Sequence, residues 1–78
     1  MVDVTPDETL DCRGLSCPMP VLKTKKALAA LGSGKVLEIM GTDPGTGNDM
    51  PKTAKKNNGE YLGEKAGDGY TSYYIKKN

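Results

Sequence analysis

The chain has 78 residues, with 11 lysines and arginines against 10 aspartates and glutamates, and it contains two cysteines and no histidine. This length allows one domain, and a domain so small buries only about 60% of the surface of its unfolded chain. Without histidine the chain cannot supply Ser-His-Asp or Cys-His catalysis. Two cysteines alone cannot complete a structural zinc site. We therefore expect neither a metal site nor an organic cofactor.

The first residues are not expected to be a secretory signal. Residues 1–7 are polar and are expected to form a flexible leader before a single domain at residues 8–78. They show neither the basic n-region nor the apolar h-region of a secretory signal. No uncharged stretch of the chain approaches the ~20 residues that span a bilayer. Two free thiols without an export signal favour a cytoplasmic location with no membrane contact.

The N-terminal half is predicted to form a strand, a helix and a second strand. Apolar and charged residues alternate over residues 8–13, which predicts a half-buried strand with Cys12 on its core face. After a break, helical periodicity runs to Leu31, and prolines at its start are tolerated only in a first helical turn. Residues 35–40 are almost continuously apolar, which predicts a strand in the interior of a sheet.

A loop and a second helix are expected next. Residues 41–47 contain glycines and a proline, which is typical of a loop. Asn48 or Asp49 can cap a short helix over residues 50–57, with Pro51 in its first turn. The apolar face of this helix is sparse and is expected to consist of little more than Met50 and Ala54.

The C-terminal part reads as a β-hairpin, with strands at residues 60–66 and 70–77 and glycines in the turn between them. The order β-α-β-α-β-β predicts an α/β two-layer sandwich, a four-stranded mixed sheet with both helices on one face. The expected core consists of Leu10, Val21, Leu28, Leu31, Val36, Leu37, Ile39, Leu62 and Ile75.

Cys17 is the candidate reactive residue because it falls where the first loop becomes a helix. A thiol at a helix N-terminus faces unpaired N–H groups and the positive end of the macrodipole. Both favour the thiolate and can lower its pKa from about 8.5. Pro18 and Pro20 remove competing N–H donors and stiffen the chain. By position alone, a reactive thiol and a small buried residue at the cap are equal alternatives.

Cys12 is expected to be a core residue rather than a second reactive thiol. Four residues separate it from Cys17, which is not the Cys-x-x-Cys spacing of thioredoxin-like redox sites. With one thiol pointing inward and the other outward, a disulfide between them needs backbone movement.

The segment Asp-x-x-Gly-Leu-x-Cys-Pro-x-Pro, which begins at Asp11 and precedes an amphipathic helix, closely resembles the TusA-type (SirA-like) sulfur-carrier proteins. The resemblance covers about residues 8–77. It implies the βαβαββ sandwich fold and a persulfide carried on Cys17. Cys12 stands where many members have no thiol, and Glu60 where members often have histidine. The motif residues that would support the site are Asp11, Arg13, Gly14, Leu15, Pro18 and Pro20.

The resemblance also implies protein partners. The sulfur donor would be of the cysteine desulfurase or rhodanese type, and the acceptor would be a protein thiol in tRNA thiolation, molybdenum-cofactor assembly or sulfur oxidation, with no requirement for nucleic acid. Two alternatives remain open. Residues 23–58 carry seven lysines against three acidic residues, so the basic helices could bind nucleic acid or protein as a regulatory module. Alternatively, Cys12 and Cys17 could form a thiol redox switch.

Overall fold

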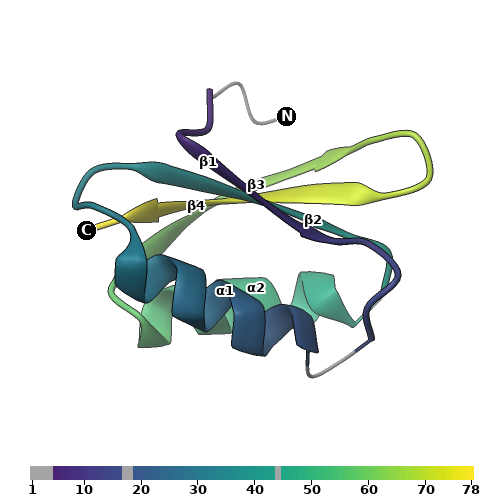
Figure 1. Cartoon of the computed structure of the whole chain (residues 1–78), viewed down its shortest axis with the longest axis horizontal. Coiled ribbons are helices and arrows are strands. Elements are labelled where there is room, and N and C mark those ends of the chain that lie inside the picture. The colour runs from purple at the N-terminus through teal and green to yellow at the C-terminus, as the bar shows by residue number, and fades with distance from the viewer. Residues whose placement is uncertain (1–4, 17–18, 44) are drawn as a thin grey trace.

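A four-stranded sheet forms one layer of the molecule and two helices form the other (Figure 1). The computed structural model describes residues 5–16, 19–43 and 45–78. Within these ranges no helix is long and apolar enough to cross a membrane. The elements in chain order are β1 (Glu8–Cys12), α1 (Met19–Ala30), β2 (Val36–Gly41), α2 (Thr46–Lys56), β3 (Gly59–Ala66) and β4 (Thr71–Lys77).

The strands lie in the order β1-β2-β4-β3, with β1 parallel to β2 and the other pairs antiparallel. A parallel pair needs a crossover connection, which α1 supplies. The mixed sheet and the interior position of β2 are therefore as predicted. Pairing begins just before β1, since the N–H of Asp7 donates to the carbonyl of Val36 (2.8 Å) and its carboxylate accepts from the N–H of Val36 (2.9 Å). The expected leader thus overlaps the sheet at its last residue.

Both helices cover the same face of the sheet, and the core lies between the two layers (Figure 1). Leu10 and Val21, two of the predicted core residues, are partly buried against it. The predictions for Val36 and Leu62 were wrong. Val36 precedes the buried Leu37, so the alternation of the strand turns it to the uncovered face, and Leu62 falls where β3 shifts register against β4. The core residues are Cys12, Leu28, Leu31, Leu37, Ile39, Met50, Ala54, Tyr73 and Ile75.

The second helix begins four residues earlier than predicted, at Thr46 instead of Met50. Its N-cap is Gly45, so the predicted caps Asn48 and Asp49 lie inside the helix. The turn before it is set by Asp43. The carboxylate of that residue accepts from the N–H of Gly45 at 2.9 Å, and its carbonyl accepts from the N–H of Thr46 at 3.0 Å. An aspartate that organises the backbone two residues on is a usual turn device.

The early start places Pro51 in the second turn of α2, not in the first turn as predicted. There its missing N–H removes one bond of the helical ladder. The helix is stabilised instead by the side chains that it buries, of which two are polar and two are apolar. Met50 and Ala54 were expected among them. The buried residues of α2 are Thr46, Met50, Thr53 and Ala54.

Candidate functional site

The loop between β1 and α1 carries the cysteine–proline motif. Cys17 and Pro18 lie outside the described residues, and the chain on either side of them is well anchored. The N–H of Leu15 donates to the carbonyl oxygen of Cys12 at 3.2 Å, which turns the chain at the end of β1. The N–H of Met19 donates to the carbonyl oxygen of Ser16 at 2.9 Å. The two residues that flank the pair are therefore tied to each other.

Asp11 and Arg13 form a bidentate ion pair at the start of this loop. The guanidinium Nε lies 2.9 Å from Oδ1 of Asp11, and Nη2 lies 3.0 Å from Oδ2. The backbone N–H of Arg13 also donates to Oδ1, at 3.1 Å. These bonds from Arg13 lower the pKa of Asp11 to about 2. Because both side chains are about half exposed, the pair fixes local geometry more than it stabilises the fold.

The Asp11 carboxylate is expected to titrate near pH 2 in the folded protein. Its pKa is lower when folded, so the pair favours the native state above pH 3.8 and loses this effect as the pH falls toward 2. Carboxyl ¹³C NMR measures the midpoint directly. In Arg13→Ala the midpoint is expected to rise part of the way to 3.8, because the backbone donor at position 13 remains. An unchanged midpoint in that variant contradicts the assignment of the shift to the guanidinium.

Two further contacts hold the loop against neighbouring segments. The N–H of Gly14 donates to Oγ1 of Thr42, just beyond β2, at 2.9 Å. Gly14 has φ +81°, a left-handed conformation that favours glycine. The guanidinium carbon of Arg13 lies 5.5 Å from the ring centroid of Tyr70, in the turn of the hairpin, which is cation–π distance. The loop between β1 and α1, which we call the motif loop, thus contacts the segment after β2 and the turn between β3 and β4.

Leu15 and Pro20 anchor the same segment to the core. Leu15 is partly buried against the core cluster, and Pro20 is fully buried in the first turn of α1. A proline there removes no helical hydrogen bond, because the first N–H groups of a helix have no partner within it. The structure therefore leaves Asp11, Arg13 and Gly14 exposed on the surface and buries Leu15 in part and Pro20 fully.

Cys12 is fully buried in the core cluster, which confirms the prediction for this residue. Its thiol is free. Burial raises the pKa of the Cys12 thiol, and the charge of Lys23 opposes this only in part. Since the thiolate is the nucleophile, Cys12 is a poor nucleophile at neutral pH.

A limiting amount of iodoacetamide is expected to label Cys17 and spare Cys12, because Cys12 is buried and its pKa is raised. Peptide mass mapping reads the two sites separately. Preferential labelling of Cys12 would reverse the roles of the two thiols.

Cys12→Ser is expected to lower the free energy of unfolding by about 1–3 kcal/mol, since a hydroxyl in this apolar layer lacks a partner. Urea unfolding measures that loss.

Sequence reasoning missed Thr42 and Tyr70. Thr42 contacts Gly14 across 28 positions of the chain, and no local pattern signals such a contact. Among the residues that the structure describes, no group of three or more His, Cys, Asp or Glu side chains could hold a metal ion. The described part of this site offers the charges of Asp11 and Arg13 and a backbone held by hydrogen bonds.

The β-α-β-α-β-β sandwich described above is the fold of the SirA-like proteins. A crystal structure of a SirA-like protein from Desulfitobacterium hafniense superimposes with a TM-score of 0.72 at 32% identity, covering 88% of this chain and 95% of that one. The family model for "Sulfurtransferase TusA" matches residues 8–77. The chain belongs to the TusA family.

Curated relatives agree with this assignment. The sulfur carrier protein TusA of Allochromatium vinosum is 42% identical over 71 residues, which cover 91% of this chain and 93% of that protein. A putative sulfur carrier protein of Bacillus subtilis is 44% identical over 68 residues, which cover 87% of this chain but 37% of that protein. The domain therefore occurs both alone and as part of longer chains.

Proposed function

We propose that this chain is a sulfur carrier that accepts sulfane sulfur as a persulfide on Cys17 and passes it to an acceptor protein. The observation that carries the proposal is the family match over residues 8–77, which includes the cysteine–proline motif. The relative from Allochromatium vinosum, which aligns over almost its whole length, is named as a sulfur carrier.

The transfer needs one thiolate and no change of net oxidation state. The Cys17 thiolate attacks the terminal sulfur of a donor persulfide, the S–S bond of the donor breaks, and the donor leaves as a thiolate. The terminal sulfur and its proton are then on Cys17 as Cys–S–SH. An acceptor thiolate attacks that outer sulfur in the same way, which regenerates the Cys17 thiolate.

The described residues support this chemistry in two ways. Helix α1 begins at Met19, two positions after Cys17 in the sequence, so the positive end of the helix dipole lies next to the motif. Such a helix start stabilises thiolate and persulfide anions. The buried Pro20 anchors this helix start, and the hydrogen bond from Gly14 to Thr42 anchors the beginning of the loop that leads to it.

The burial of Cys12 weighs against the alternative of a redox switch. A switch needs both thiols accessible to each other, whereas Cys12 is fully buried and its burial raises the pKa of its thiol. Sulfur transfer through Cys17 requires only one reactive thiol.

The proposal includes the kinds of partner and the location. The donor is a cysteine desulfurase or a rhodanese-type protein, and the acceptor is a protein thiol of tRNA thiolation, molybdenum-cofactor assembly or sulfur oxidation. Nucleic acid is not required, and the relay operates in the reducing cytoplasm. Residues 8–78 form the single domain that carries the sulfur.

Intact-protein mass spectrometry tests the proposal. After incubation with a cysteine desulfurase and cysteine, the chain is expected to gain the mass of one sulfur atom, and a reductant is expected to remove it. If no sulfur is gained under conditions in which the desulfurase is active, the chain is not a carrier for that donor class and the regulatory-module alternative gains support.

A further inference from the structure

A groove runs between the two helices, in the part of the molecule that the sulfur chemistry does not use. Its volume is about 480 Å³, and the surface that lines it is mainly apolar. Helix α1 contributes one wall and α2 the other. We call it the α1–α2 groove; its lining residues are Val21, Leu22, Lys25, Asp49, Lys52, Thr53, Lys56 and Asn57.

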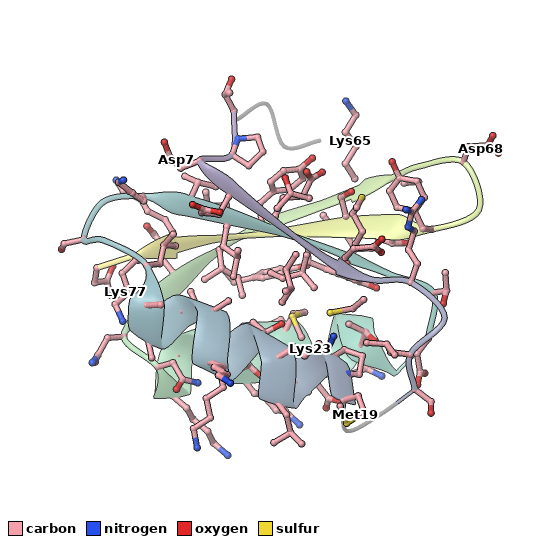
Figure 2. All side chains as sticks on the ribbon, viewed as in Figure 1. Asp7, Met19, Lys23, Lys65, Asp68 and Lys77 are labelled. Carbon is pink, nitrogen blue, oxygen red and sulfur yellow. The ribbon has the colours of Figure 1, made fainter. Side chains whose placement is uncertain are left out.

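The helical layer is strongly basic. The two helices together hold six lysines and one acidic residue, Asp49, a net charge of +5. The rest of the chain holds five basic and nine acidic residues, a net charge of −4. In Figure 2 nitrogen-tipped side chains gather along the outer side of the helices. Three of the six lysines, Lys25, Lys52 and Lys56, line the groove.

Two large apolar side chains are exposed on α1, Leu22 in the groove and Met19 outside it. Leu22 is 53% exposed and Met19 is 43% exposed, and these are the exposed large hydrophobic side chains among the described residues. They are three positions apart on α1 and therefore share one face of the helix. Met19 points away from the sheet at the first turn of α1 (Figure 2). The apolar strip thus leads from the helix end next to the cysteine–proline motif into the groove.

We propose that the α1–α2 groove docks a segment of the protein with which Cys17 exchanges sulfur, a segment in which carboxylates flank an apolar side chain. The carboxylates pair with Lys25, Lys52 and Lys56, and the apolar side chain covers Leu22. Docking there orients the partner's sulfur toward the start of α1. This inference rests on the proposed function of Cys17 for the identity of the partner, and on the groove itself for the partner's chemistry.

The groove favours a protein over a nucleic acid. Single-stranded nucleic acids are bound through aromatic side chains on which the bases stack. No aromatic residue lines the groove, because all four tyrosines lie in β3, β4 or the turn between them. The net charge of −4 outside the helices also repels a long polyanion, whereas it leaves a short acidic segment unaffected beyond the Debye length of about 8 Å.

A binding experiment with a defined probe tests the groove. The probe is a fluorescein-labelled Gly-Glu-Glu-Leu-Asp-Glu-Gly peptide, read by fluorescence anisotropy. The double variant Lys25→Glu/Lys56→Glu is expected to weaken binding at least about tenfold, and added salt is expected to weaken wild-type binding. Leu22→Ser is expected to weaken binding without changing the salt dependence.

The matched control is Lys26→Glu/Lys55→Glu. It changes the same net charge on the same two helices, at neighbouring positions that do not line the groove. At physiological salt it is expected to weaken binding less than about threefold, because screened charges act mainly at short range. Equal losses in the two double variants, no binding of the peptide, or tighter binding of a single-stranded RNA through the same lysines would each overturn the proposal.

A second measurement separates this proposal from that for Cys17. Lys25→Glu/Lys56→Glu is expected to load sulfur normally from cysteine persulfide, a small donor, but about tenfold more slowly from a limiting cysteine desulfurase. Cys17→Ser is expected to fail with both donors. If the groove variant loads at the wild-type rate from the desulfurase, the groove is not the docking site. If the wild-type chain loads from neither donor, the proposed function fails, and the peptide experiment alone decides whether the groove binds acidic segments.

Discussion

Cys17→Ser is expected to abolish sulfur loading completely and to leave the domain folded. Serine is nearly isosteric with cysteine, and its hydroxyl is well suited to the start of a helix, so the free energy of unfolding should change by less than ~1 kcal/mol. A serine hydroxyl is not ionised at neutral pH and lacks the polarisability of sulfur. It therefore cannot attack a persulfide or hold its outer sulfur.

Intact mass after incubation with a cysteine desulfurase and cysteine measures the loading, and circular dichroism with urea unfolding measures the fold. Cys12→Ser is the matched control, because it removes the other thiol of the chain. It is expected to keep full loading while losing stability, since Cys12 lies in the core. Equal loading of wild type and Cys17→Ser would end the assignment of the persulfide to this residue.

The periodicity of apolar residues in the sequence was sufficient to predict the architecture. Alternation around Cys12, the three-to-four-residue repeat that buries Thr24 and Leu28, and the apolar run of β2 each correspond to an observed element. These patterns are local consequences of which side of an element faces the core, so a single sequence contains them. The β-hairpin followed in the same way from its glycine-rich turn.

The errors arose where the deciding contact is not local. Thr46 is polar, and nothing near it in the sequence indicates that α2 buries it. The shift of register at Leu62 depends on how β3 meets β4. In each case the tertiary partner, rather than the propensity of the residue, decides the outcome.

The candidate site also has a part that is visible in the sequence and a part that only the folded chain brings together. The cysteine–proline motif is contiguous, so its resemblance to the sulfur-carrier family is visible in the sequence alone, and the reactive role of Cys17 stays a prediction from that resemblance. The contacts that fasten the motif loop come from Thr42 and Tyr70, on segments that only the folded sheet brings near it. The α1–α2 groove likewise exists only when the two helices pack side by side, although its lysines are visible in the sequence as two basic helices.

Leu28→Ala is expected to destabilise the domain more than any surface substitution. Leu28 is fully buried between α1 and the sheet, and deletion of a buried leucine side chain costs about 2–5 kcal/mol. Domains of this size have little stability to lose, because native proteins are stable by about 5–15 kcal/mol and small domains bury less of their surface. The melting temperature should fall by at least ~8 °C, at ~4–8 °C for each kcal/mol.

Leu22→Ala, on the same helix, is the matched control for Leu28→Ala. Both substitutions replace leucine by alanine within α1, so the change in helix propensity is nearly the same, and the two variants differ in what the side chain contacts. Leu22 is 53% exposed, and its loss should change the free energy of unfolding by no more than about 0.5 kcal/mol. Urea denaturation of both variants gives the two values directly. Losses of similar size would mean that α1 does not pack through Leu28. The expected pattern is instead a large loss at Leu28 and an almost neutral Leu22, which leaves Leu22 available to a partner in the α1–α2 groove because the fold itself does not require it.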